Sequence, residues 1–198
     1  EEAEDVRALL KYGPDTAGGL MTSEPIVLSA DSTVAEALAR WTAQDPRVAE
    51  QVAVVEIDPD LADTATLNAA HDLPPAVSAN CVLVAGRRGG DERTAAAVVR
   101  ATTRADVNTR VRSLLDVRKA SFLPMDRAVA ESGMEYGGIT PIGLPEGWRV
   151  LLDAAVATDG EAALIGSGLR RSKLLLPGAL LARLPGVELV EGLGVPVG

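Results

Sequence analysis

Aromatic residues are scarce in this chain of 198 residues, because two Trp, two Tyr and one Phe make up 3% of it. The core must therefore be built from Ala, Val and Leu, and stacking platforms for nucleic-acid bases are few. Histidine and cysteine occur once each, as His71 and Cys81. A single cysteine excludes an intramolecular disulfide. No Cys/His cluster has the spacing of a zinc site, so neither a metal site nor a cofactor is expected.

Long apolar runs are also missing, since no stretch reaches the roughly 20 residues that a membrane helix needs. The first residues are acidic, so no signal peptide is visible. Both features predict a cytoplasmic protein without a membrane partner. The net charge is −9, of which nine acids and three bases in residues 1–45 contribute −6. An acidic chain does not attract nucleic acid through its overall field, so no DNA partner is expected and any RNA contact must rest on a local basic patch.

Composition and pattern divide the chain near residues 43–46. The hydrophobic fraction of 47% predicts a packed interior rather than disorder. Residues 1–45 read as a short helix at 1–12, a strand at 25–28 and a second helix at 34–41, joined by a Gly-rich segment. We therefore predict a helix-strand-helix appendage before a main domain at 46–198.

The main domain alternates between strand and helix signals, which predicts an α+β fold with a curved, mainly antiparallel sheet. A polar turn is expected at 86–93. The expected strands are 52–57, 81–85, 94–102, 119–123, 150–153, 162–166, 172–175 and 187–190, and the expected helices are 58–71, 106–115, 124–132 and 177–184.

Two Gly-rich segments could carry chemistry. Residues 137–143 hold three glycines and one proline, and such a loop can bring its backbone amides close to an ester oxygen. Residues 165–173 place Gly-Ser-Gly before Arg170, Arg171 and Lys173, which suits a phosphate or the end of a tRNA. The alternatives are an ordinary turn and a hairpin turn with solvated bases.

Other reactive groups offer less. Arg118 and Lys119, with three arginines upstream, could line one side of a basic groove. Ser167 does not sit in a nucleophile elbow. Cys81 lies in an apolar strand context that suits a buried thiol and argues against a Cys-His pair with His71.

Five segments at 82–84, 103–115, 118–122, 137–143 and 165–174 follow one another in a specific order. From about residue 48 to 193 this combination resembles the YbaK/prolyl-tRNA-synthetase-associated domain family, whose members remove wrongly attached amino acids from tRNA. The resemblance implies a curved mixed sheet or partial barrel surrounded by helices. It also implies trans-editing hydrolysis of aminoacyl-tRNA esters, with the tRNA acceptor end and an aminoacyl-tRNA synthetase as partners.

The resemblance assigns roles to particular residues. It places Gly137 and Pro141 at the aminoacyl ester. Family deacylases usually carry a lysine where this chain has Asn80, and the amide of Asn80 can still support an oxyanion. The expected substrate-binding residues are Gly138, Thr140, Gly166, Ser167 and Gly168, and the expected tRNA-binding residues are Arg118, Lys119, Arg170, Arg171 and Lys173.

Two alternatives stay open at this stage. The neutral Asn80 fits a module that binds tRNA ends or a synthetase without catalysis. Residues 1–41 resemble the segment of MgtE-type magnesium transporters that leads into a CBS domain, which fits an unrelated fragment or linker, or a magnesium-sensing regulatory appendage.

Overall fold

A long antiparallel hairpin forms the centre of the larger sheet, which has five strands. The computed structural model describes residues 50–145, 147–158, 160–184 and 186–197, together with Leu38 and Val48. The hairpin pairs β2 with β3, flanked by β5 on one side and by β6 and β9 on the other, and the last two pairings are parallel. The strands are β2 (Ala79–Arg88), β3 (Asp91–Arg100), β5 (Ala120–Phe122), β6 (Arg149–Asp153) and β9 (Val187–Val190).

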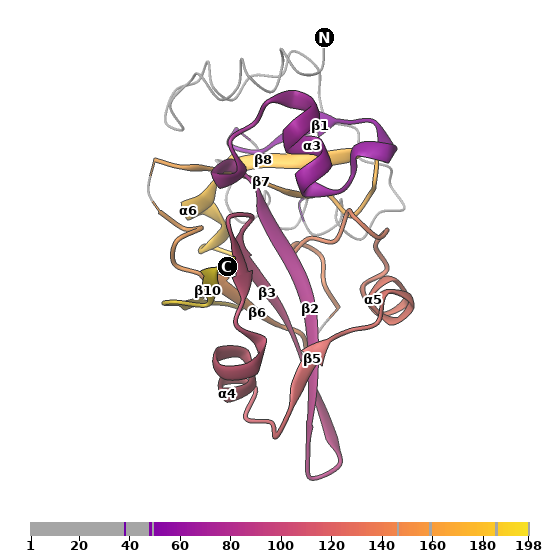
Figure 1. The fold of residues 1–198 in the computed structure, drawn as a ribbon, viewed down its shortest axis with the longest axis vertical. Coiled ribbons are helices and arrows are strands. Elements are labelled where there is room, and N and C mark those ends of the chain that lie inside the picture. Colours follow the sequence, from indigo (N-terminus) through magenta and orange to yellow (C-terminus); the bar gives the residue numbers. More distant parts are fainter. Residues whose placement is uncertain are drawn as a thin grey trace.

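A smaller antiparallel sheet lies near the end of the hairpin where β2 begins (Figure 1). Its order is β1-β8-β7, with β1 at Ala53–Glu56, β8 at Ser172–Pro177 and β7 at Ala162–Gly166. A short ribbon pairs β4 (Thr103–Ala105) with β10 (Gly194–Pro196).

The α-helices whose bounds the structure describes are short. They are α3 (Thr64–His71), α4 (Arg112–Leu114, which continues a π-helical turn at Val107–Val111), α5 (Met125–Ser132) and α6 (Gly178–Leu181). In Figure 1, α3 lies beside the three-stranded sheet, whereas α4 lies beside the five-stranded sheet toward the hairpin turn. Among the described helices, none has the length and apolar character needed to cross a membrane.

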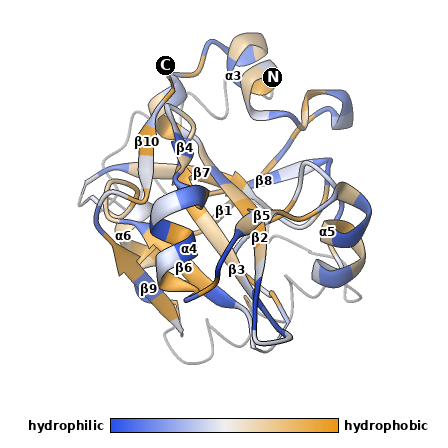
Figure 2. Ribbon diagram, turned by 60° about the horizontal axis from the view of Figure 1, so that its bottom comes forward, coloured by the Kyte–Doolittle hydropathy of each residue, from blue (hydrophilic) through white to orange (hydrophobic). Residues whose placement is uncertain are grey.

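The core is made of aliphatic side chains, as the scarcity of aromatics predicts. One cluster joins the two sheets, with Val98 and Leu152 from the larger sheet against Ile165 and Leu174 from the smaller one. Figure 2 shows this segregation: apolar residues follow the central strands, whereas the hairpin tip and much of α5 are hydrophilic.

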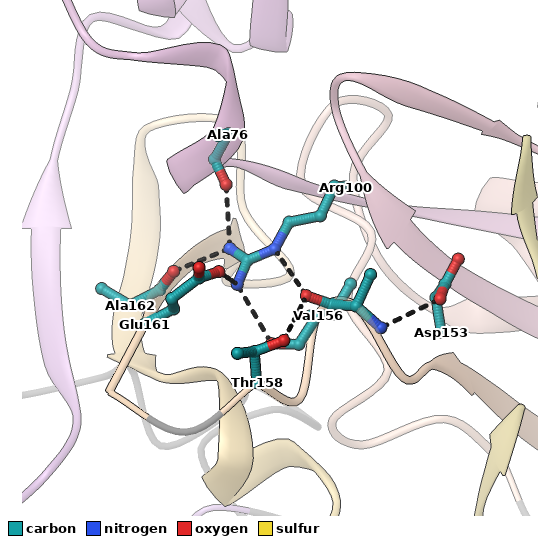
Figure 3. A network of polar contacts seen from close by, with 8 residues as sticks. Ala76, Arg100, Asp153, Val156, Thr158, Glu161 and Ala162 are labelled. Carbon is teal, nitrogen blue, oxygen red and sulfur yellow. Dashed lines mark hydrogen bonds and ion pairs between the residues drawn. The ribbon is translucent and has the colours of Figure 1, made fainter. Parts of the chain in front are cut away.

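A buried guanidinium ties the end of β3 to the smaller sheet (Figure 3). The side chain of Arg100 is 6% exposed and forms five hydrogen bonds. Burial lowers its pKa and the ion pair with Glu161 opposes that shift. The four backbone acceptors are the carbonyl oxygens of Ala76, Ala155, Val156 and Ala162, and the fifth acceptor is the Glu161 carboxylate.

Most predicted elements are found, and the α+β class with mixed, mainly antiparallel sheets is confirmed; within the described residues the sheets do not close into a barrel. The polar turn predicted at 86–93 is wrong in extent. The strands continue to Arg88 and resume at Asp91, because Gly89 and Gly90 (φ 61° and 97°) supply the left-handed conformations of a two-residue hairpin turn. The strand ends on both sides of this turn are exposed to solvent, so charged residues can occupy the last positions of β2 and the first positions of β3.

The helix predicted over 58–71 is divided. A 3₁₀ turn covers Pro59–Leu61, and α3 starts anew at Thr64 because the Asp63 carboxylate accepts hydrogen bonds from the N–H groups of Ala65 and Thr66. The appendage predicted at 1–45 lies outside the described residues, with one exception. Leu38 packs into the core cluster that joins the two sheets.

Candidate functional site

A cavity of about 910 Å³ opens between α3, the first residues of β2, and the two Gly-rich segments. Of the residues predicted from the sequence, five line it: Asn80, Gly137, Gly166, Arg170 and Lys173. These residues are up to 93 positions apart in the chain. The fold therefore brings together Asn80 and the two Gly-rich segments, which are separate features in the sequence.

The two Gly-rich segments form one wall of this cavity by packing backbone against backbone. The N–H of Gly168 donates to the carbonyl of Gly138 at 2.7 Å, and the N–H of Glu135 donates to the carbonyl of Gly168 at 2.9 Å. A Cβ at Gly166 would lie 2.3 Å from the Gly138 oxygen, and a Cβ at Gly138 would lie 2.6 Å from the Leu169 backbone. Glycine at these positions permits the close approach.

Gly137 presents its peptide at the cavity surface. Its φ of 86° lies in the left-handed region, and a Cβ there would lie 3.1 Å from the Ala62 Cβ. Its carbonyl accepts a hydrogen bond from Lys173. Gly137 and Ile139 both line the cavity, and no hydrogen bond from their N–H groups to another described residue is found.

Asn80 is held by the first residue of α3. The hydroxyl of Thr64 donates to the Asn80 Oδ1 at 2.7 Å, which leaves the amide NH₂ group of Asn80 as the free donor. Asp63 fixes the position of Thr64 because it caps α3. Sequence reasoning missed Thr64, although Asp63 followed by a threonine-rich apolar segment is a recognisable helix start.

Lys173 lies in the cavity wall and not on the surface. It is 5% exposed, and its Nζ donates to the carbonyls of Ala62 and Gly137, both at 2.8 Å. Burial lowers the pKa of its ammonium to about 8; Asp63 counteracts this shift and Arg170 adds to it. The predicted contact of Lys173 with tRNA phosphates does not suit a side chain placed in this way.

Arg170 lies at the rim of the cavity. Its guanidinium donates to the carbonyls of Tyr136 at 3.0 Å and Pro59 at 2.9 Å, and its backbone N–H donates to Glu135. Beside it Tyr136 lines the same cavity and is 56% exposed. Tyr136 is not among the site residues predicted from the sequence, although an exposed aromatic is informative in a chain with so few.

The remaining predicted residues do not line the cavity. Ser167 is fully buried and its hydroxyl bonds to Ser172, which makes it a packing residue of the β7–β8 turn. Thr140 and Pro141 are buried behind the loop surface. Arg118, Lys119 and Arg171 are exposed and outside the cavity lining, while Gly138 and Gly168 support the wall from behind.

Cys81 lines the cavity next to Asn80 but is not suited to nucleophilic attack. Burial raises the pKa of its thiol to about 12, so the thiol stays protonated at neutral pH. Within the described part of the chain, no group of three His, Cys, Asp or Glu side chains is placed to hold a metal ion. The polar groups that line this cavity include the Asn80 amide and the Lys173 ammonium.

Comparison with known proteins agrees with this geometry. A model of the aminoacyl-tRNA editing domain matches residues 58–184, a range that contains the whole cavity lining. No curated protein matches the chain. Among solved structures, the hypothetical protein APE2540 has a TM-score of 0.67 at 14% identity and covers 80% of this chain and 99% of its own. A protein proposed to be a trans-editing enzyme for prolyl tRNA synthetase has a TM-score of 0.62 at 16% identity, over 86% and 99%.

At such low sequence identity the solved structures establish the fold alone. The family model covers well over half of the chain and therefore assigns the chain to its family. The resemblance predicted from the sequence is thereby confirmed. The chain belongs to the aminoacyl-tRNA editing domain family.

Proposed function

We propose that this protein hydrolyses the ester bond of mischarged aminoacyl-tRNA and acts in trans, as an aminoacyl-tRNA deacylase. The observation that carries the proposal is the convergence of Asn80, Gly137 and Gly166 on one cavity. A pocket that offers several neutral donors around a narrow backbone loop suits an ester carbonyl whose oxygen becomes negative during attack.

The reaction requires few protein groups. The aminoacyl ester enters with its carbonyl oxygen toward the N–H groups of Gly137 and Ile139, and the Asn80 amide donates to the same oxygen or to the attacking water. The water oxygen bonds to the carbonyl carbon, and the bond to the ribose oxygen breaks. The proton released by the water ends on the ribose, which yields a free amino acid and a tRNA with its terminal hydroxyl restored.

The proposed partner is the acceptor end of the tRNA, in the cytoplasm where synthetases charge it. Tyr136 and Arg170 lie at the cavity rim, where an aromatic face and a cation can receive the terminal nucleotide. Arg118 and Lys119 precede β5, whose first residue pairs with Gly86 of β2. Because a strand rises about 3.3 Å per residue, they lie about 20 Å from Asn80 along β2. At that distance they can meet acceptor-stem phosphates while the ester occupies the cavity.

The test is loss of ester from a panel of tRNAs charged with Ser, Ala or Cys. Acceleration over the spontaneous rate is expected for at least one of them, and no acceleration for any would contradict the proposal. Gly137→Val should reduce the rate to background, because a side chain there strains the backbone and meets Ala62. Gly147→Val is the matched control, since Gly147 has φ 88° and nothing within 4 Å of its missing Cβ.

A module that binds tRNA without hydrolysis is the second candidate, and it is favoured by the neutral Asn80 and the protonated Cys81 thiol. Tight, salt-sensitive tRNA binding without turnover on the same panel would select it.

A further inference from the structure

A lysine is held inside the wall of the cavity by two backbone carbonyls. Lys173 sits on β8 between Gly166 of β7 and Val55 of β1, in the middle of the smaller sheet. An ammonium that is 5% exposed carries a large desolvation cost, and lysines near a surface usually extend their head group into water. Lys173 instead points its Nζ at the cavity.

The two acceptors belong to different segments of the site. Ala62 precedes α3, and Gly137 begins the loop expected to receive the ester. The Lys173 ammonium therefore joins these segments at the point where a Cβ on Gly137 would meet Ala62. An ammonium has three donors, so one remains for a ligand or a water.

Ionisable side chains from several elements line the cavity with Lys173. Asp60, Asp63 and Asp72 come from the turn before α3 and from the two caps of that helix. Arg170 comes from the β7–β8 turn, Tyr136 from the loop before Gly137, and Cys81 from β2, where the neutral Asn80 precedes it. Asp63 favours the ammonium, whereas Arg170 and the stronger effect of burial disfavour it, which lowers the pKa to about 8. At neutral pH the ammonium form predominates, and it titrates within an accessible range.

We propose that Lys173 is the positioning residue of the ester site: its ammonium fixes the Gly137 peptide against Ala62 and places a positive charge beside the loop that receives the ester carbonyl. This inference rests on the proposed deacylase activity. The carbonyl oxygen becomes negative when water attacks, and a nearby fixed cation stabilises that oxygen more than it stabilises the neutral ester. Loss of the proton from Lys173 removes the charge and weakens its hold on the loop.

The experiment compares the pH dependence of deacylation in wild type, Lys173→Arg and Lys173→Met, corrected for spontaneous ester loss. With a pKa of about 8, the active ammonium fraction falls roughly tenfold between pH 7 and 9. Lys173→Arg should keep activity and lose this decline, because a guanidinium stays charged. Lys173→Met should lose about 100-fold in kcat at pH 7 and show no decline of its own.

Two features keep the outcome interpretable. The substrate α-amino group titrates near the same pH, so the difference between wild type and Lys173→Arg reports on Lys173, not the wild-type curve alone. Arg183→Met removes an exposed cation that neither lines the cavity nor belongs to the residues proposed to bind tRNA, and it should leave rate and profile unchanged. Thermal melts establish that each variant is folded.

If Lys173→Met has the same rate and pH profile as the wild type, the inference about Lys173 is wrong, whereas the proposed deacylase function is unaffected. If the wild type hydrolyses no ester, the proposed function fails, and binding decides the inference instead. An amide-linked seryl-adenosine analogue, which cannot be hydrolysed as an ester, should bind Lys173→Met at least tenfold more weakly than wild type. Equal affinity would overturn the role of Lys173.

Discussion

At the scale of single residues, a hydrogen bond from Thr64 holds the side-chain amide of Asn80. In the structure the Thr64 hydroxyl donates to the Asn80 Oδ1 at 2.7 Å, which leaves the NH₂ group of this amide as the donor available to a ligand. An asparagine held in this way can act as a donor, and a positive charge lies in the same cavity on Lys173 of β8.

Removing this donor should slow the chemical step more than substrate binding. Asn80→Ala is expected to lower kcat by about 10²–10³, the effect of deleting one donor to an oxyanion. Thr64→Val should lower it by about tenfold, because the Asn80 amide remains but loses its orientation. Thr66→Val is the control, since its hydroxyl bonds to the Asp63 cap and not to Asn80. Single-turnover ester loss measures all three, and a wild-type rate for Asn80→Ala would show that its amide does not reach the reacting carbonyl.

At the scale of elements, the cavity depends on how β3 is attached to the smaller sheet. The Arg100 guanidinium satisfies four carbonyls from the segments around residues 76, 155–156 and 162, and β7 continues from there to Gly166. Without the guanidinium these buried acceptors would be left unpaired.

Arg100→Met is therefore expected to lower the free energy of unfolding by about 3 kcal/mol or more. Glu161→Ala should cost less than about 1 kcal/mol, because the Glu161 side chain is 57% exposed and its ion pair is partly screened by water. Urea unfolding of both variants measures the difference. Similar costs for the two would mean that the ion pair, and not the set of carbonyls, is what stabilises this junction.

The elements themselves were largely predictable, because short apolar stretches mark β1, β7 and β9 and the sequence Pro124 to Gly133 marks α5. The β4–β10 ribbon was not, since three-residue strands are too short for a period to show. The depth of Lys173 could not be predicted either. In the sequence it ends a run of bases, and its burial depends on which face of β8 the α3 segment covers.

At the scale of the whole molecule, the core extends beyond the residues of the editing-domain match. Val48 and Leu38 both precede residue 58, where the match begins, and both are buried in the cluster that joins the two sheets. Leu38 falls within the segment predicted to be a separate appendage, yet its side chain is 9% exposed. The boundary near residue 45 stays a prediction, and the packing of Leu38 offers a way to test it.

If Leu38 contributes to the core, Leu38→Ala should lower the free energy of unfolding by about 2–3 kcal/mol, the cost of a buried Leu-to-Ala change. Deleting residues 1–45 should cost at least as much, because it removes the same side chain. Leu189→Ala on β9 is the matched control; Leu189 is 57% exposed, so its truncation should stay within about 0.5 kcal/mol. Urea midpoints in the full chain measure each change. If Leu38→Ala changes the free energy of unfolding as little as Leu189→Ala does, Leu38 does not stabilise the editing domain. That result would favour the prediction of a separate appendage at residues 1–45.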